Sequence, residues 1–418
     1  MNISAVAKLR EKRSAFDVFL MILMAFYLIQ KMPIVSYYTN TYISMLVYVL
    51  MLVLFLSVDK VCLNRLPILL LAALFYAGQY ALDLALEGTQ FFYLIWSVFL
   101  ALLPIFVGTI IVYNKMDYLA RIAVPLILIA YTFTALTTYL GLLDHPEASR
   151  LMAADPTAYH RYFPHNIGGF NFVYSFVLLH PLMICYLREK RLWFLAPPLT
   201  AIGGMCVLAS EYTTAALLFV ISCIAYFFPS RTTRNRARFR TKLILFAMVL
   251  ALLFLPSILD FLAELPIFAS SEEKLQDVAN VLRGQESESI STQNRIYFYQ
   301  KSWDSFAADP MLGGKVFGRS RAGGHSFVLD TLADWGIVGF ALVAILYWYF
   351  RKLYSRICKK SSASLYATLF FLLIIAICVL NPHAWLFEVG FAAPVFLFAS
   401  TPRQSLEKED LKKGENDQ

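Results

Sequence analysis

The sequence predicts an all-α polytopic membrane protein with about twelve transmembrane helices and one large extracytoplasmic loop. Hydrophobic residues make up 59% of the 418-residue chain, charged residues only 15%, and the mean hydropathy is +0.62. This balance excludes a soluble globular protein of this length. Apolar runs of about 20 residues, the length that a helix needs to cross a bilayer core of about 30 Å, recur along the chain. Lysine and arginine gather in alternate connecting segments, as in the cytoplasmic loops of such proteins.

The apolar runs define about twelve predicted spans. In order, they cover approximately 16–34, 40–57, 66–84, 91–112, 120–141, 168–187, 192–208, 211–228, 242–258, 327–349, 363–380 and 385–400. The first follows a basic stretch but lacks a small-residue cleavage site, so we interpret it as an uncleaved first helix. Only Ser210 and its neighbours separate the seventh run from the eighth. These two runs therefore predict either two spans or one re-entrant hairpin.

The distribution of positive charge orients the spans. Most of the 36 lysine and arginine residues fall on one side of the predicted membrane, together with both ends of the chain, so both termini are predicted to be cytoplasmic. The predicted domains are then 1–258 with the first nine helices, 259–326 as the large extracytoplasmic loop, 327–400 with the last three helices, and 401–418 as a cytoplasmic tail.

The net charge of +8 does not indicate a nucleic-acid partner. Its densest cluster, from Arg231 to Arg240, lies in a predicted cytoplasmic loop, where basic residues contact anionic lipid. We therefore expect the lipid bilayer as a partner and no nucleic acid. The six cysteines fall in predicted spans or on the cytoplasmic side, so no disulfide framework is predicted.

The large outer loop has two parts of different character. Residues 271–290 are acidic and polar, which predicts a mobile lid. Residues 291–312 carry apolar side chains at helical spacing, which predicts an amphipathic helix that lies on the bilayer surface and ends near Pro310. These apolar side chains are Ile296, Phe298, Tyr299 and Trp303.

A histidine opens the tenth predicted span. The motif reads Gly323-Gly324-His325-Ser326, then nine residues, then Gly336-Ile337-Val338-Gly339. A histidine with a reference pKa near ~6.5 can act as a base at neutral pH. Paired glycines at a helix N-terminus allow backbone amides to approach an anion, and arginine binds phosphate oxygens through its planar fork. The candidate arginines are Arg295, Arg319 and Arg321, with Arg283 behind them.

Simpler interpretations of these residues stay open. A lone histidine at a helix start is more often a cap or a surface residue. Gly336 and Gly339 are most simply packing glycines that let a neighbouring span come close. Asp330 and Asp334 lie one helical turn apart, and acids at this depth are either ion-paired or line a watery cavity.

The histidine motif resembles the signature of the O-antigen ligase and Wzy-type polysaccharide polymerase superfamily. In that signature a histidine, a small polar residue, nine residues and a Gly-x-x-small spacing follow a large extracytoplasmic loop with a functional arginine. The segment from Arg161 to Asn171 also resembles a pattern that such polymerases carry ahead of their sixth helix. One departure is Ser210-Glu211, where relatives often have Ser-Arg. Either another arginine substitutes for the missing cation, or the substrate differs.

The resemblance implies a GT-C-like, metal-independent glycosyltransferase without a cofactor, in the bacterial cytoplasmic membrane, with its active site on the extracytoplasmic face. The implied donor is an undecaprenyl-diphosphate-linked glycan. The acceptor is a glycan or lipid: another lipid-linked repeat unit for a polymerase, or lipid A-core for a ligase, with a protein acceptor in a related branch. We favour the polymerase because of the Arg161 to Asn171 segment. A chain-length regulator protein is a further implied partner.

The resemblance also implies the roles of individual residues. The catalytic pair would be His325 and Arg295. The residues implied to bind the substrate or its diphosphate are Arg161, Arg319, Arg321, Gly323, Gly324 and Ser326.

Other classes find less support in the sequence. It contains no CxxC, HExxH or P-loop motif, so a zinc hydrolase or an ATP-driven pump is not predicted. A lipid-linked glycan transporter is the alternative from another class. Transporters, however, place charges and broken helices near the bilayer midplane, whereas here the charges crowd the outer face.

Overall fold

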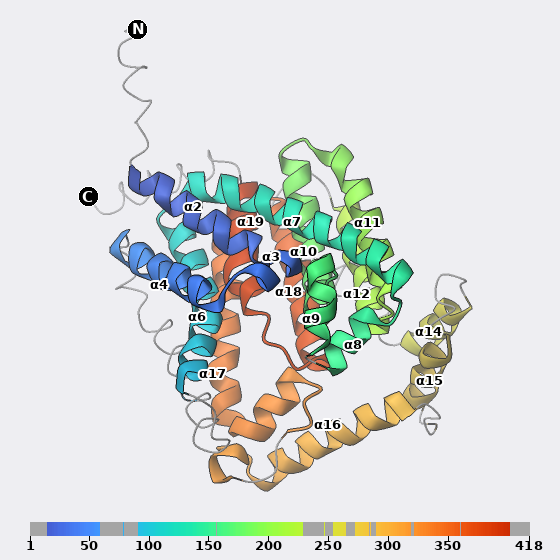
Figure 1. Ribbon diagram of the computed structural model, residues 1–418. Helices are drawn as coiled ribbons and strands as arrows, with labels where there is room; N and C mark the ends of the chain where they lie inside the picture. The colour runs from blue at the N-terminus through green and yellow to red at the C-terminus, as the bar shows by residue number, and fades with distance from the viewer. Residues whose placement is uncertain are drawn as a thin grey trace, which may run out of the picture.

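The regular structure of the described chain is helical throughout (Figure 1). The structure is a computed structural model. It describes residues 15–58, 91–155, 157–228, 254–264, 272–283, 290–318, 322–359 and 361–401, together with positions 78, 246 and 285. No strand occurs within these ranges. The all-α prediction is therefore confirmed.

Among the described residues, four helices are long and apolar enough to cross a membrane. They are α7 (Asp117–Asp144), α10 (Phe170–Glu189), α17 (Phe327–Ile357) and α18 (Ala363–Leu380). Further apolar helices pack around them: α2 (Ala15–Ile29), α4 (Thr41–Val58), α6 (Phe91–Tyr113), α11 (Ala196–Ala209), α12 (Thr213–Ser222) and α19 (Ala393–Ser400). The protein is thus a multi-pass membrane protein. Almost all of the predicted span 66–84, and most of 242–258, lie outside the described residues.

The first predicted span, 16–34, is interrupted. α2 ends at Ile29, and a separate short helix, α3 (Pro33–Tyr38), begins with Pro33 at its first turn. Proline lacks a backbone N–H and its ring clashes with the preceding turn, so it starts a helix more readily than it continues one. The junction between α2 and α3 leaves Lys31 outside both helices.

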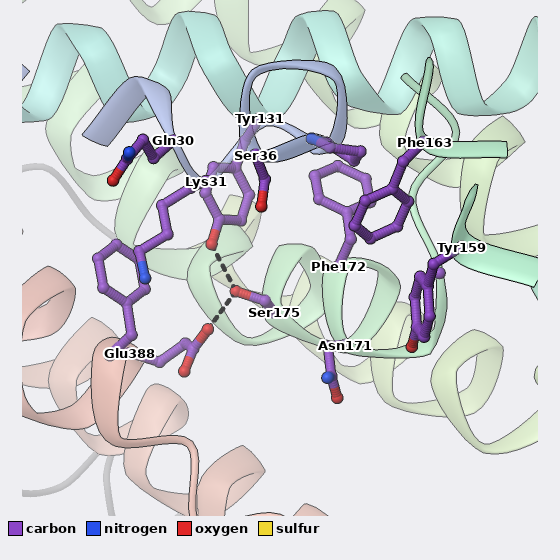
Figure 2. Close-up of a pocket in the computed structure, with 13 residues that line it drawn as sticks. Gln30, Lys31, Ser36, Tyr131, Tyr159, Phe163, Asn171, Phe172, Ser175 and Glu388 are labelled. Carbon is purple, nitrogen blue, oxygen red and sulfur yellow. Dashed lines mark hydrogen bonds between the residues drawn. The ribbon is translucent and has the colours of Figure 1, made fainter. Parts of the chain in front are cut away.

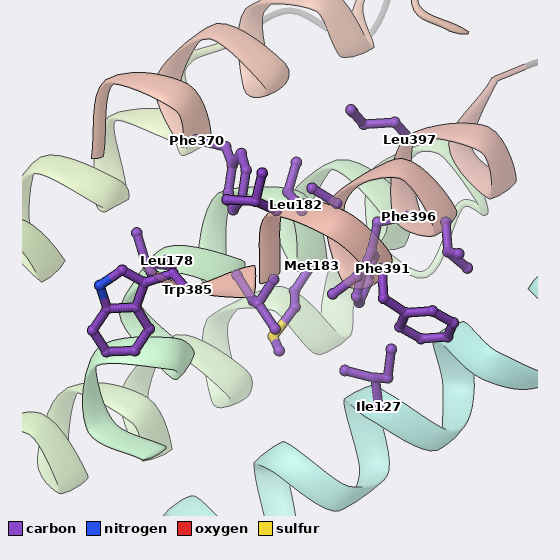
Figure 3. Packing of buried hydrophobic residues seen from close by; sticks show 14 of the residues in the cluster. Ile127, Leu178, Leu182, Met183, Phe370, Trp385, Phe391, Phe396 and Leu397 are labelled. Carbon is purple, nitrogen blue, oxygen red and sulfur yellow. The ribbon is translucent and has the colours of Figure 1, made fainter. Parts of the chain in front are cut away.

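Helix α10 is the centre of the bundle. Its residues from Val173 to Leu187 are all buried, because the sequence is apolar around the whole helix. Figure 3 shows Leu178, Leu182 and Met183 among the side chains of the central cluster. The neighbours in that cluster come from α7, α18 and the last helix, which begins with a π-helical turn, Glu388–Ala392, and continues as α19.

Helices α11 and α12 form an antiparallel hairpin. His180 of α10 lies between them, with Nε2 2.8 Å from the Thr200 hydroxyl near the start of α11 and Nδ1 2.8 Å from the Ser222 hydroxyl at the end of α12. The chain reverses at residues 210–212, where Glu211 has a positive φ of 53°. The seventh and eighth apolar runs are therefore two distinct helices, and His180 is a buried packing residue.

The two loops between spans fold into short helices. The first forms α8 (Ala148–Ala154), α9 (Ala158–Tyr162) and a 3-10 turn, Phe163–His165. The second contains α14 (Leu255–Ala263), α15 (Glu272–Leu282) and α16 (Ile290–Ala308). In Figure 1, α16 runs from the packed pair α14 and α15 towards the start of α17. The predicted helix over 291–312 is confirmed as α16, which ends just before Pro310.

Helix α17 is broken at Gly336, which has φ 61° and ψ −162°. The first backbone N–H groups after the break donate to a turn that follows α16: Ile337 to the Pro310 carbonyl at 2.8 Å, and Val338 to the Met311 carbonyl at 3.2 Å. A Cβ at Gly336 would lie 2.4 Å from the Met311 carbonyl. Our expectation of a neighbouring span at Gly336 is therefore wrong, because the turn that follows α16 occupies that position.

Candidate functional site

His325 lies in a loop, residues 322–326, between α16 and α17. Ser302 of α16 holds one side of this loop, because its hydroxyl oxygen accepts the backbone N–H of Gly323 at 2.8 Å. The same hydroxyl donates to Oδ1 of Asp330 in α17, also at 2.8 Å. Ser302 is only 1% exposed, so both hydrogen bonds are shielded from water. The His325 loop is therefore fixed to both helices through one side chain.

Asp330 holds the other side of the loop. Its carboxylate accepts the backbone N–H of Gly324 at 3.2 Å and of Ser326 at 3.0 Å. One turn further along α17, Asp334 accepts the N–H of Ala322 at 3.4 Å. Hydrogen bonds to a charged group contribute about 1.5–3 kcal/mol each. In the part of the chain that the structure describes, Asp330 therefore orders the loop through backbone amides, rather than through an ion pair as one of our two interpretations had it.

The two loop glycines have conformational roles. Their N–H groups, which we expected to face an anion, already have protein acceptors. A Cβ at Gly323 would lie 2.3 Å from the Phe298 carbonyl oxygen. Gly324 has φ +78°, a left-handed conformation that glycine adopts without a steric cost. Both glycines shape the loop, and their contact with a diphosphate stays a prediction.

Ser326 caps the start of α17. Its buried hydroxyl accepts the backbone N–H of Leu329 at 3.2 Å, one of the donors that a helix start leaves without a partner. Another N–H group of this helix start, that of Phe327, donates to the Asn381 carbonyl at 2.8 Å. A role for Ser326 in substrate binding also stays a prediction.

The half-buried His325 imidazole lies against the Phe298 ring, with ring centroids 4.6 Å apart and ring planes at 58°. Its pKa is lowered from 6.5, first by burial and then by the positive charge of Arg295, while the Asp330 carboxylate acts in the opposite direction. At neutral pH the ring is therefore uncharged, which is the form that can accept a proton.

Arg295 lies on α16 with its side chain exposed. It interacts electrostatically with His325, with Tyr299 on the next turn, and with Tyr174 of α10. Within the described ranges, no ion pair or hydrogen bond engages its guanidinium. A cation in this position, between His325 and α10, can bind an anionic group that enters from outside.

One face of α16 carries the residues that meet the His325 loop. They follow the i, i+3, i+4, i+7 spacing of a single helix face: Arg295, Phe298, Tyr299 and Ser302. Ile296 and Trp303 are 41% and 55% exposed on the remaining surface. Phe298 and Tyr299 thus pack towards the loop while Ile296 and Trp303 stay outside it, and the position of this helix on the bilayer surface stays a prediction.

The segment between α18 and the last helix completes the site, and sequence reasoning missed it. Asn381 is buried and its side chain reaches Tyr174. The His383 ring lies 5.5 Å from the Phe170 ring and 5.7 Å from the Trp385 ring, between centroids, and burial lowers its pKa. The available signal was the Asn-Pro-His-Ala-Trp sequence directly after an apolar run.

Three of the predicted arginines are not placed at His325. Arg319 and Arg321 lie outside the described residues. Arg161 is exposed, with its guanidinium carbon 5.2 Å from the Tyr162 ring centroid. No contact in the described part of the chain joins Arg161 to His325. The roles of all three stay predictions.

Two ion pairs account for other charges near the outer loops. Arg283, the reserve candidate, pairs with Asp260 and so joins α15 to α14. Glu211, which departs from the family pattern, accepts Arg150 Nη2 at 2.9 Å on its carboxylate. A cation is thus present beside Glu211, but it is neutralised there. In the described ranges, no three His, Cys, Asp or Glu side chains gather as a metal site.

A comparison with family models identifies the segment that contains this network. Residues 198–344 match the model described as O-antigen ligase. This segment is an O-antigen ligase domain. It extends from α11 to the second half of α17 and includes Arg295, Ser302, His325 and Asp330. No curated protein matches the chain at a significant level.

The match to the O-antigen ligase family covers the part of this multi-pass membrane protein in which His325 and Arg295 interact electrostatically. Enzymes of this family transfer glycans in polysaccharide biosynthesis. The resemblance stated from the histidine motif is thereby confirmed. The frame of Ser302 and Asp330, which the motif did not reveal, lies within the same domain.

Proposed function

We propose that the protein transfers a glycan from undecaprenyl diphosphate to an acceptor hydroxyl at the outer face of the bacterial cytoplasmic membrane, as a polymerase of polysaccharide repeat units. The observation that carries this proposal is the pairing of an uncharged His325 with Arg295, which lacks a counter-ion among the described residues. Both are held on one frame inside an O-antigen ligase domain.

The reaction needs what these two side chains supply. An imidazole nitrogen of His325 accepts the proton of the acceptor hydroxyl, and that oxygen forms the new bond to the anomeric carbon of the donor. The bond from this carbon to the diphosphate oxygen breaks, and undecaprenyl diphosphate leaves. Arg295 binds the departing phosphate oxygens through its planar fork. Arg319 and Arg321, two residues of the same outer segment, would add positive charge to this leaving group.

The choice of a repeat-unit polymerase rests on the Arg161 to Asn171 segment, which resembles the polymerase branch. A ligase that uses lipid A-core, or an enzyme that uses a protein acceptor, would need the same base and cation. A transporter is disfavoured because family membership implies glycan transfer, and because Arg295 and His325 lie at a span end rather than at a broken-helix midplane site. A chain-length regulator would be a partner only of the polymerase.

The proposal includes a topology of about twelve spans in a GT-C-like arrangement, with residues 259–326 outside. A cysteine introduced within 275–290 should react with a membrane-impermeant thiol reagent in intact cells or spheroplasts, and one within 232–240 should not. The described native cysteines are buried or half-buried, so their background labelling should be low. Labelling only of the second position would overturn the proposed outer face.

The decisive experiment is transfer by purified protein in vesicles that contain the lipid-linked donor. His325→Ala should lower the transfer rate by about 10²–10⁴-fold, the usual effect of losing a general base. The matched control is His160→Ala, which removes an exposed histidine from the first outer loop. Polymer synthesis by His325→Ala at the rate of the control would disprove the assignment of the base.

A further inference from the structure

A cavity is lined by segments other than the His325 loop (Figure 2). It has a volume of about 280 Å³ and is formed by the junction of α2 and α3, by α7, by the first outer loop, by the start of α10 and by the start of the last helix. All of these segments lie towards the outer face in the proposed topology.

A buried acid forms one wall of the cavity. Glu388 is only 6% exposed and accepts a hydrogen bond from the Ser175 hydroxyl. Ser175 lies in turn 2.7 Å from the Tyr131 hydroxyl, so that three helices contribute to one chain of hydrogen bonds, as Figure 2 shows. Glu388 also begins the π-helical turn of the last helix. Such turns are frequently found at functional sites.

A lysine lines the same side of the cavity as Glu388 (Figure 2). The Lys31 ammonium lies 4.9 Å from the Tyr27 ring centroid and 4.6 Å from the Phe387 ring centroid. It interacts electrostatically with Glu388, but no ion pair or hydrogen bond engages the ammonium among the residues that the structure describes. A charged group in the membrane is costly unless it is paired or meets a polar ligand. A polar molecule in the cavity can therefore contact both Lys31 and Glu388.

Another polar group at this cavity also has no hydrogen-bond partner in the described chain. The side-chain oxygen of Gln30 is buried without a hydrogen-bond partner, although Gln30 is only 7% exposed. Asn171, an exposed residue, also lines the cavity and adds an amide that a ligand can reach. Aromatic rings of Tyr159 and Phe172 cover the apolar side. Buried polar groups in native proteins are almost always satisfied, so this combination indicates a ligand.

We propose that this cavity binds one sugar residue of the glycan substrate, a proposal that rests on the function proposed above. Neighbouring hydroxyl groups of a sugar can accept a hydrogen bond from the Lys31 ammonium and donate one to the Glu388 carboxylate. The C–H face of the same ring packs on an aromatic side chain such as Phe172. A diphosphate would bring negative charge against Glu388, and an acyl chain would offer the Lys31 ammonium no hydrogen-bond acceptor. A neutral polyhydroxyl ring can form hydrogen bonds with both Lys31 and Glu388.

The start of α10 separates this sugar site from the candidate active site. Asn171, Phe172 and Ser175 line the cavity, whereas Phe170 contacts His383 and Tyr174 interacts with Arg295. A helix with its side chains is about 10–12 Å across. The bound sugar is therefore a unit beyond the reacting bond. The site would select the glycan and would not take part in bond breaking.

The test compares Lys31→Met and Glu388→Gln with a matched control, Lys352→Met. Lys352 also lies 4.9 Å from an aromatic ring centroid, that of Trp348, but at the far part of α17. The probe is the repeat-unit oligosaccharide released by mild acid from the lipid-linked donor. Calorimetry should give a Kd about 10–100-fold higher for the two cavity variants, because hydrogen bonds to charged groups contribute about 1.5–3 kcal/mol. The control should bind as the wild type does.

Transfer kinetics then separate the two proposals. The cavity variants should raise KM while kcat stays within about threefold, because the lost contacts bind ground state and transition state equally. If the wild type binds the oligosaccharide through Lys31 and Glu388 but transfers nothing, the proposed function is wrong and the sugar site stands. If transfer is normal and neither substitution changes Kd or KM, the sugar site is wrong and the function stands. Lys31→Met carries the test should Glu388→Gln fail to fold, as judged by thermal melting.

A competition experiment distinguishes whether the cavity binds the sugar or the diphosphate of the donor. Undecaprenyl diphosphate without a sugar should not displace the oligosaccharide from the cavity. Displacement by that lipid, lost in Lys31→Met, would assign the cavity to the diphosphate and overturn the sugar proposal.

Discussion

The hydroxyl of Ser302 lies 2.8 Å from Oδ1 of Asp330, and this contact joins the helix that carries Arg295 to the helix that follows His325. Ser302 was not a candidate from sequence, because a serine in a polar helix has no distinctive spacing, and Asp330 was predicted only to be ion-paired or to line a cavity. The hydrogen bond between Ser302 and Asp330 has a geometric consequence. Arg295 lies on α16 and His325 lies directly before α17, so this bond sets the separation of the cation and the base.

Replacement of Asp330 by asparagine should therefore damage transfer. The amide keeps the shape of the carboxylate, but it cannot accept the N–H groups of Gly324 and Ser326 with the strength of a charged acceptor. We expect the transfer rate to fall about 10–100-fold, which corresponds to about 1.4 kcal/mol for each factor of ten. The control is Asp304→Asn on the exposed side of α16. Equal rates for both variants would show that Asp330 does not order the loop.

Two glycines with positive φ should respond differently to alanine. Gly336→Ala combines left-handed strain with a Cβ only 2.4 Å from the Met311 carbonyl, so the turn after α16 must move. Gly324→Ala meets nothing within 4 Å and should cost only the strain, about 1–2 kcal/mol. Thermal melting and transfer assays should show a larger loss of both stability and activity for Gly336→Ala. A Gly324→Ala protein that melts normally yet transfers nothing would instead support direct contact of Gly324 with the substrate.

The sequence predicted local features more successfully than contacts between distant segments. The helix over 291–312, the helix start at His325 and the apolar spans follow from periodicity and caps, which are properties of adjacent residues. The break at Gly336 does not follow from adjacent residues. The carbonyls that stabilise it belong to Pro310 and Met311, far away in the sequence. The helical spacing of apolar residues continues through Gly336, so this spacing does not indicate the break.

The candidate site was predicted in part for the same reason. The motif indicated His325 and Arg295, whose residue types carry the chemistry. The positioning roles of Ser302 and Asp330 depend on how two helices pack, and Asn381 arrives from a third segment. Lys31 was hidden inside a predicted span by its apolar neighbours, although Pro33 was a signal that the helix ends there.

The pH dependence of transfer should show the lowered pKa of His325. His325 acts as a base only when uncharged, so kcat/KM should rise with pH through an acidic limb that lies below pH 6.5 and then reach a plateau. Arg295→Gln removes a charge that lowers this pKa, and the limb of its residual activity should move to higher pH. Lys301→Gln on the same helix is the control and should leave the limb in place. An acidic limb that does not respond to Arg295→Gln would mean that another group titrates.

Arg295 should not tolerate replacement by lysine. A guanidinium binds two phosphate oxygens through a planar fork, whereas an ammonium acts as a point charge. We expect kcat/KM for the lipid-linked donor to be nearly as low in Arg295→Lys as in Arg295→Ala. Retention of most activity by the lysine variant would indicate a general electrostatic role. Protein content in the membrane should be measured for each variant, so that a loss of protein is not read as a loss of rate.

Transfer should require neither a divalent cation nor ATP. The diphosphate bond of the donor already carries the driving force, and Arg295 stabilises the charge that develops on the leaving group, with Arg319 and Arg321 as further candidates. Purified protein with the lipid-linked donor should therefore work at an undiminished rate in excess EDTA. Activity that disappears on chelation and returns with magnesium or manganese would refute this mechanism. Replacement of Asp330, Asp334 and Glu211 one at a time would then identify the carboxylate that binds the metal.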